Sequence, residues 1–187
     1  MFTLLPAVGV ELPHRAGLLR FGMSEQRAQW ATSTLADVRE ERLCVRSRAA
    51  GVAWAFYAEY EDLVISVSGG PGPGGHAPGL DEIRFARRSD PLPDAPAAVP
   101  VVYEGIDLFG YPAPEVEEAL AALHPHATGE ETLTEESGLT LGRHAAARSP
   151  GPAGRGPRHP AGRDPATTRY LASATLTGPE RYRLMVG

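Results

Sequence analysis

Two histidines and a nearby glutamate could bind a metal ion. His124 and His126 stand in the segment LHPHATGEE, and Glu130 follows four residues later. Neutral imidazole and carboxylate groups are ligands that suit zinc. However, His-Pro-His is not the i, i+4 pair that places two histidines on one helical face, and the helix dipole favours a histidine at a helix C-terminus. Two interpretations therefore stay open, a metal site at His124, His126 and Glu130, or a capping and surface role.

Aromatic and acidic side chains form a second candidate site, a surface that binds another protein. The segment VAWAFYAEY places Trp54, Phe56 and Tyr60 on one face of an expected strand. Such a face usually belongs to the core, but any exposed part of it would bind a partner, because aromatic side chains concentrate the binding energy of interfaces. Glu104 and Asp107 begin an acidic region that would contribute to the same surface.

The patterns of several enzyme classes are missing from the sequence. Gly-x-Ser-x-Gly, the nucleophile elbow, does not occur. The glycine-rich segment 69–79 lies between two expected strands, and the chain has no lysine, whereas a phosphate-binding loop needs a helix N-terminus and usually a lysine. We expect the carboxylates of Glu59, Glu61 and Asp62 to be solvated on a hairpin turn. The sequence therefore favours a protein that is not an enzyme and predicts no cofactor.

Charge and cysteine content limit the partners and the compartment. The net charge is −5, which gives no general attraction to nucleic acid or to an anionic membrane. No apolar run approaches the ~18–20 residues of a transmembrane helix. The N-terminal segment lacks a basic region and contains a proline, so we expect no secretion signal. The single cysteine, Cys44, fits a reducing compartment, and we expect a cytoplasmic protein with a protein partner.

The charges are unevenly distributed along the chain. Residues 89–142 contain 11 acidic residues and no arginine, whereas residues 143–187 contain 8 arginines and 2 acidic residues. Within the basic part, residues 148–166 are so rich in proline, glycine and arginine that they cannot pack a core, and we expect disorder there. Two interpretations of this segment stay open, an ordinary disordered insertion and a local frameshift in the gene.

The periodicity predicts an α+β fold with an antiparallel sheet and two helices. Ser24 is the expected N-cap of the first helix, a hairpin is expected over 54–68, and the second helix begins near Pro112 and runs to Leu123. Further strands are expected at 80–88, 101–109 and 138–144 and near the C-terminus. The predicted organisation is a first half at 1–90, a proline-rich linker at 91–100, and a second half formed by 101–147 and 167–187.

Two segments of the chain resemble each other. GLLRFGMSEQRAQWATSTL begins at position 17, and GIDLFGYPAPEVEEALAAL begins at position 105. Each contains Gly-x-x-x-Phe-Gly before an expected helix, in which the phenylalanine would anchor the segment and the second glycine would permit a turn with positive φ. The pattern predicts a possible tandem repeat of a helix-plus-hairpin unit, with these residues in structural roles: Gly17, Phe21, Gly22, Gly105, Phe109 and Gly110.

The segment LRFGMSEQRAQWA resembles the opening of a small α+β module of bacterial outer-membrane assembly lipoproteins and tandem β-lactamase inhibitor proteins. In that module a Gly-Met-Ser/Thr turn leads into a helix, and a curved antiparallel sheet follows; residues 22–24 match the turn. The chain departs from it at Ala28, where a bulkier aliphatic residue is usual. The whole chain is similar to an actinobacterial family that pairs LRFGM with GIDLFG segments. The resemblances imply the fold and a preference for protein–protein binding.

Two hypotheses for the function follow from these observations. The first is a non-enzymatic interaction protein, such as an inhibitor or an immunity-type partner, that uses an open sheet face and the acidic region. The second is an activity that depends on a metal or a small molecule around His124 and His126. We favour the first, because the sequence presents no assembled catalytic set.

Overall fold

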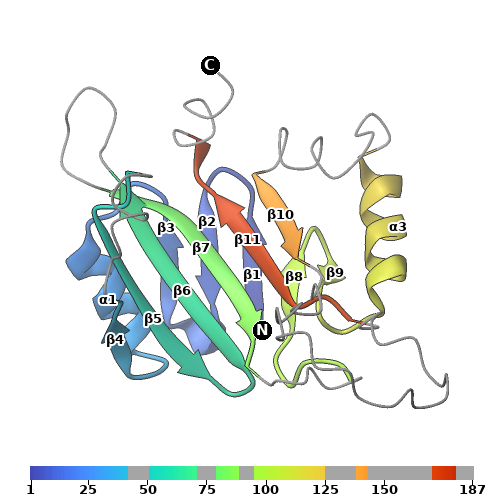
Figure 1. Ribbon diagram of the computed structural model, residues 1–187, viewed down its shortest axis with the longest axis horizontal. Coiled ribbons are helices and arrows are strands. Elements are labelled where there is room, and N and C mark those ends of the chain that lie inside the picture. Colours follow the sequence, from blue (N-terminus) through green and yellow to red (C-terminus); the bar gives the residue numbers. More distant parts are fainter. Residues whose placement is uncertain (42–50, 71–78, 89–94, 125–137, 143–169, 180–187) are drawn as a thin grey trace, which may run out of the picture.

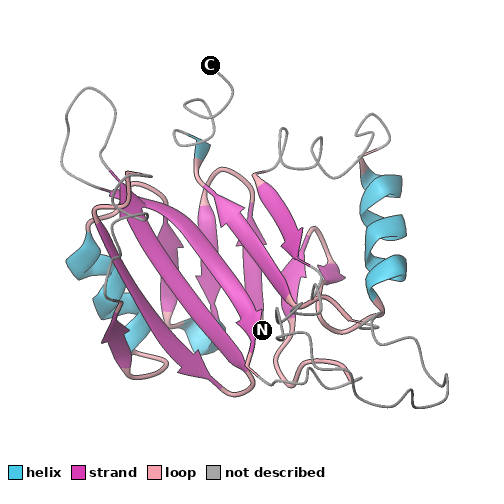
Figure 2. Ribbon diagram, viewed as in Figure 1, coloured by secondary structure: helices cyan, strands magenta, loops and turns pink. Residues whose placement is uncertain are grey.

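Two β-sheets stack face to face, and a helix lies at each end of the stack (Figure 1). The computed structural model describes residues 1–41, 51–70, 79–88, 95–124, 138–142 and 170–179. Figure 2 shows that strands dominate the described part of the chain. The α+β class expected from the sequence is confirmed, and the sheets are mostly antiparallel.

The five-stranded sheet has the order β3-β2-β1-β8-β9. Its strands are β1 (Phe2–Leu5), β2 (Gly9–Leu12), β3 (Gly17–Arg20), β8 (Val101–Tyr103) and β9 (Ile106–Asp107). A short 3-10 helix, η1 (Pro13–Arg15), joins β2 to β3. The central pair β1–β8 is parallel, with Phe2 opposite Val101, and the other pairs are antiparallel.

The six-stranded sheet has the order β10-β11-β7-β6-β5-β4, and all of its pairs are antiparallel. Its strands are β4 (Val38–Glu40), β5 (Trp54–Tyr60), β6 (Leu63–Gly70), β7 (Gly79–Arg87), β10 (Leu139–Gly142) and β11 (Ser173–Thr177). The hairpin expected over 54–68 is confirmed as β5–β6, and Glu61 at its turn has a φ of +54°.

The helices α1 (Glu25–Ser33) and α3 (Ala113–Leu123) pack small apolar faces against the core. Ala28 and Ala31 of α1 and Val116 and Leu120 of α3 are buried, as the sequence pattern predicts. The spacing of Val116, Leu120 and Leu123 along α3 predicts that all three face the core, but Leu123 in the last turn is 50% exposed. Within the described residues, neither helix has the length and apolar composition needed to cross a lipid bilayer.

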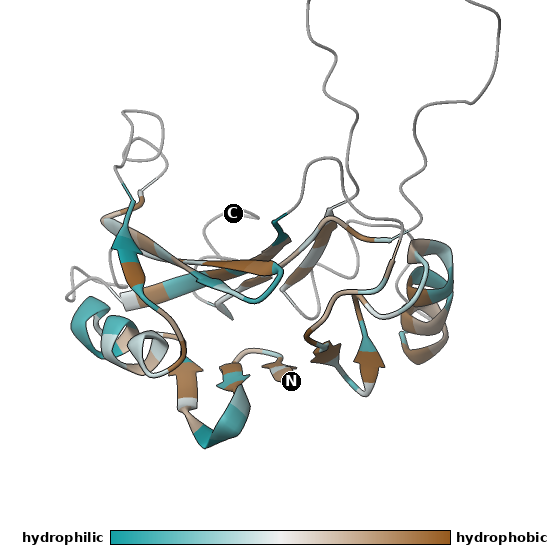
Figure 3. Ribbon diagram, turned by 90° about the horizontal axis from the view of Figure 1, so that it is seen from below, coloured by the Kyte–Doolittle hydropathy of each residue, from teal (hydrophilic) through white to brown (hydrophobic). Residues whose placement is uncertain are grey.

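One continuous core lies between the sheets (Figure 3). Phe2 and Leu4 from the five-stranded sheet face Ile65 and Phe85 from the six-stranded sheet, and all four are 0–2% exposed. The rings of Phe2 and Phe85 are 5.0 Å apart between centroids, a distance typical of packed aromatic pairs. This contact joins strands from the two sheets directly.

The segment that the sequence analysis singled out as RFGM connects the two sheets. Gly22 has a φ of +80°, so the turn into α1 with positive φ, expected from the sequence, is confirmed. The Gly22 amide donates to the Leu80 carbonyl at 2.8 Å, and the Leu80 amide donates to the Met23 carbonyl at 2.9 Å. These bonds attach the end of β3 to the start of β7 and fix the position of α1.

Each sheet contains strands from both of the halves expected from the sequence. β8 pairs with β1, and β11 pairs with β7. The last part of the expected linker, residues 95–100, also binds the rest of the fold. The Ala98 amide donates to both carboxylate oxygens of Asp62 at 3.1 Å, and Val99 is buried. Residues 89–94 and the expected insertion at 148–166 lie outside the described residues.

The two similar segments occupy opposite sides of the central β1–β8 pair. Phe109 is completely buried, whereas Phe21 is partly buried. Gly17, Gly22 and Gly105 have positive φ, but Gly110 does not. A Cβ atom at Gly110 would instead overlap the Asp107 carboxylate, so close packing explains this glycine. The tandem repeat stays a prediction.

Candidate functional site

Strands from both halves build the six-stranded sheet, and one face of this sheet points away from the core. Along β5 and β6, alternate residues such as Phe56, Ile65 and Val67 are completely buried, so the residues between them point away from the core. Figure 3 shows the five-stranded sheet and α1 on the other side of this sheet. The term outer face is used below for this surface.

One row of directly paired residues crosses the outer face from edge to edge. Residues opposite each other on paired strands point to the same side, with Cβ atoms about 4.5–5.5 Å apart. All six residues are exposed or half-buried. In the order β4 to β10, the central row consists of Arg39, Tyr57, Ser66, Arg84, Thr175 and Thr140.

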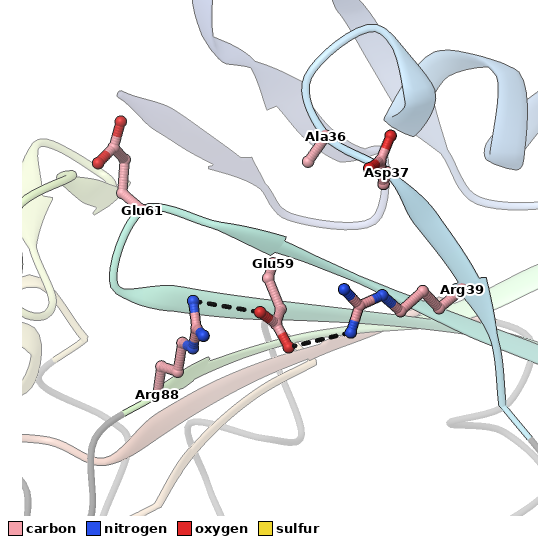
Figure 4. A pocket seen from close by; sticks show the side chains of 6 residues that line it. All are labelled: Ala36, Asp37, Arg39, Glu59, Glu61 and Arg88. Carbon is pink, nitrogen blue, oxygen red and sulfur yellow. Dashed lines mark ion pairs between the residues drawn. The ribbon is translucent and has the colours of Figure 1, made fainter.

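A charged cavity of about 400 Å³ lies at the end of this face where β5 turns into β6 (Figure 4). Glu59 of β5 lies between two arginines. Its carboxylate oxygens form ion pairs with a guanidinium nitrogen of Arg39 at 3.6 Å and of Arg88 at 3.1 Å. The guanidinium-bearing side chains are 60% and 58% exposed, so solvent screens both ion pairs. Asp37 and Glu61 complete the charged lining.

Arg39 belongs both to the lining of the cavity and to the central row. The pKa of its guanidinium is raised above the ordinary value, chiefly because the guanidinium hydrogen-bonds the Tyr57 side chain and then because the Glu59 carboxylate is close. The cavity and the central row are therefore one connected set of polar side chains. This set can make directed hydrogen bonds and ion pairs with a partner.

The aromatic residues expected to bind a partner belong mostly to the core. Trp54 is 6% exposed and Phe56 is 0% exposed, and their rings stack at 5.9 Å. Alternation turns these two residues inward, as expected if this face belongs to the core, so neither side chain is exposed to a partner. Tyr60 is half-buried; its ring meets Phe2 edge-on, and its hydroxyl lies 3.1 Å from a ring nitrogen of His14.

The two acidic candidates have separate structural roles. One oxygen of the Asp107 carboxylate accepts hydrogen bonds from the amides of Phe109 at 3.2 Å and Val101 at 3.3 Å, and so holds the β8–β9 turn. Glu104 lies at the same turn and contacts a ring nitrogen of His124 at 2.8 Å. Both residues belong to the β8–β9 hairpin of the five-stranded sheet, whereas Tyr60 ends β5 of the six-stranded sheet.

The candidate metal site is only partly within the described residues. His124 is the C-cap residue that follows α3 and contacts Glu104, whereas His126 and Glu130 lie outside the described part of the chain. Among the described residues there is no group of three histidine, cysteine or acidic side chains that could hold a metal ion. The metal hypothesis stays a prediction.

Sequence reasoning missed the outer face and one exposed aromatic residue. Trp30 on α1 is 72% exposed, beside the exposed Arg27. The alternation in β5 and β6 could have predicted the outer face, but predicting its central row requires the pairing register of six strands.

Comparisons with protein-family models, with curated proteins and with solved structures find no match for this chain.

Proposed function

We propose that this chain is a non-enzymatic protein-binding protein, of the inhibitor or immunity type, that holds its partner on the outer face of the six-stranded sheet. The observation that carries the proposal is the central row, in which tyrosine, arginine and hydroxyl side chains follow one another across six paired strands. Tyrosine and arginine are enriched among the residues that dominate binding energy, and serine beside tyrosine is typical of antibody binding surfaces.

The rigidity of the sheet supports this proposal. Each member of the row is fixed by backbone pairing to neighbours on one or both sides, and the buried side chains Phe56, Ile65 and Phe85 lie directly beneath it. Binding therefore requires little ordering of the backbone, and less of the interaction free energy is lost to entropy. A rigid, polar and open sheet suits a flat protein surface better than a small molecule, which requires an enclosed pocket.

A photocrosslinking experiment tests the proposal. A benzophenone amino acid replaces Ser66 in the centre of the row or Thr140 at its β10 end, and the protein is expressed in the cells from which the gene comes. The matched control places the same amino acid at Arg27, an exposed position on α1 away from the outer face. Both test positions should yield the same crosslinked protein, and the control should not.

The crosslinked protein is then identified by mass spectrometry, purified and titrated against the unlabelled chain. Binding of the purified partner that is lost when Tyr57 becomes alanine supports the proposal. Equal crosslinking from Arg27, or no discrete product from Ser66 and Thr140 in folded protein, refutes it. Far-ultraviolet circular dichroism of each labelled variant shows that the chain is folded.

A further inference from the structure

Arg84 occupies the middle of the outer face. It belongs to β7, which lies between β6 and β11, and it is directly opposite Ser66 on one side and Thr175 on the other. Its side chain is exposed. Among the residues that the structure describes, Arg84 makes no ion pair or side-chain hydrogen bond.

The surroundings of Arg84 differ from those of Arg39 and Arg88 on the same face. Arg39 and Arg88 both contact the carboxylate of Glu59, so their charges are compensated. The neighbours of Arg84 in the row are short hydroxyl side chains, which are too small to cover a guanidinium. The hydroxyl groups can instead donate hydrogen bonds to any acceptor that the guanidinium binds.

We propose that the partner presents an acidic side chain, aspartate or glutamate, to Arg84. This inference rests on the proposed function and names the chemistry of the partner at the centre of the interface. The guanidinium donates two hydrogen bonds to the carboxylate, and the hydroxyls of Ser66 and Thr175 donate to its remaining lone pairs. Charge-assisted pairs of this kind are short, directional and about twice as strong as neutral hydrogen bonds.

The charges around Arg84 favour a single carboxylate over a polyanion. Glu82 lies two residues away on the same face of β7, and Glu59 lies in the neighbouring row. The whole chain has a net charge of −5. A nucleic acid would bring a continuous series of phosphates towards these carboxylates, whereas one acidic side chain on a protein contacts Arg84 alone.

Nuclear magnetic resonance with short peptides tests this inference on the full chain. The probe is acetyl-Gly-Glu-Gly-amide, and the isosteric control is acetyl-Gly-Gln-Gly-amide. The readouts are the side-chain Nε–Hε signal of Arg84 and the backbone amide signals of Ser66 and Thr175. The glutamate peptide should saturate these shifts at a concentration about two- to fivefold lower than the glutamine peptide, because only the former makes an ion pair with the exposed guanidinium.

Three variants separate the role of Arg84 from a general effect of charge. Arg84→Gln should abolish the difference between the two peptides, and Arg84→Lys should keep part of it, because lysine retains the charge but not the planar fork. The matched control Arg27→Gln removes an exposed arginine from α1 and should leave the difference unchanged. Replacing both Ser66 and Thr175 with alanine should lower the affinity for the glutamate peptide by about two- to tenfold.

The outcomes that overturn the inference are distinct from those that overturn the proposed function. Equal shifts with both peptides, or a peptide difference that persists in Arg84→Gln, refute a carboxylate site at Arg84. Tighter binding of hexathymidylate than of the glutamate peptide at the same signals refutes it in favour of nucleic acid. If the labelled position 66 still crosslinks a partner and Arg84→Gln leaves the affinity for that partner unchanged, only this inference fails. If no partner is crosslinked, this inference and the proposed function both fail.

Discussion

Replacing Gly9 with alanine should disrupt the five-stranded sheet. The sequence pattern alone did not predict this role for Gly9. Gly9 has a φ of +140° and lies opposite Arg20 at the end of the β2–β3 ladder. A Cβ atom there would overlap the backbone carbonyl of Leu19, which no side-chain rotation can relieve. β3 must therefore move away, which exposes the fully buried Leu19 at about 2–3 kcal/mol and breaks ladder hydrogen bonds at about 1 kcal/mol each.

The expected loss is at least about 4 kcal/mol of unfolding free energy, given these contributions. The matched control is Gly105→Ala, because Gly105 has a φ of +86° but open space around its missing Cβ. This control variant introduces only backbone strain, so its unfolding free energy should fall by about 1–2 kcal/mol. Urea unfolding in a Trp30→Phe background, followed through the fluorescence of buried Trp54, measures both values. A Gly9→Ala loss no larger than that of the control would refute the placement of β3 against β2.

Three further predictions concern individual side chains. Trp54→Phe should leave a red-shifted emission that acrylamide quenches readily, because Trp30 is 72% exposed, whereas Trp30→Phe should leave a blue-shifted and protected emission. Asp107→Ala should cost about 1–3 kcal/mol in urea unfolding, because two backbone amides lose their shared acceptor. Glu59→Gln should change the unfolding free energy by less than about 1 kcal/mol, because both of its arginine partners are more than half exposed.

The sequence predicted those elements whose signal is local. Alternation marked the β5–β6 hairpin, and the position before a helix marked Ser24, which is the N-cap residue of α1, although its hydroxyl makes no capping hydrogen bond. Proline at the start of α3 was an equally local signal. Such elements are determined by neighbouring residues and can be found without knowing the fold.

The first three strands were not predicted, because each is only four residues long and prolines and glycines interrupt the segment. Residues of β1 gain their stability from β8, which lies far away in the sequence. The outer face was missed for the same reason, since Arg84 and Tyr57 become neighbours of one row only through the register of β5, β6 and β7. Trp54 and Phe56 were correctly placed on one face, but only the layer beneath the sheet determines that this face is buried.

The parallel pairing of β1 with β8 also has a consequence for synthesis of the chain on the ribosome. Phe2 leaves the ribosome about a hundred residues before its partner Val101. β11, which completes the pairing of β7, emerges later still. Contacts between such distant residues slow folding, because a long loop must close before they form. The nascent chain therefore carries one edge of β1 unpaired until β8 has emerged, and the pairing of β7 is complete only after β11 has been released.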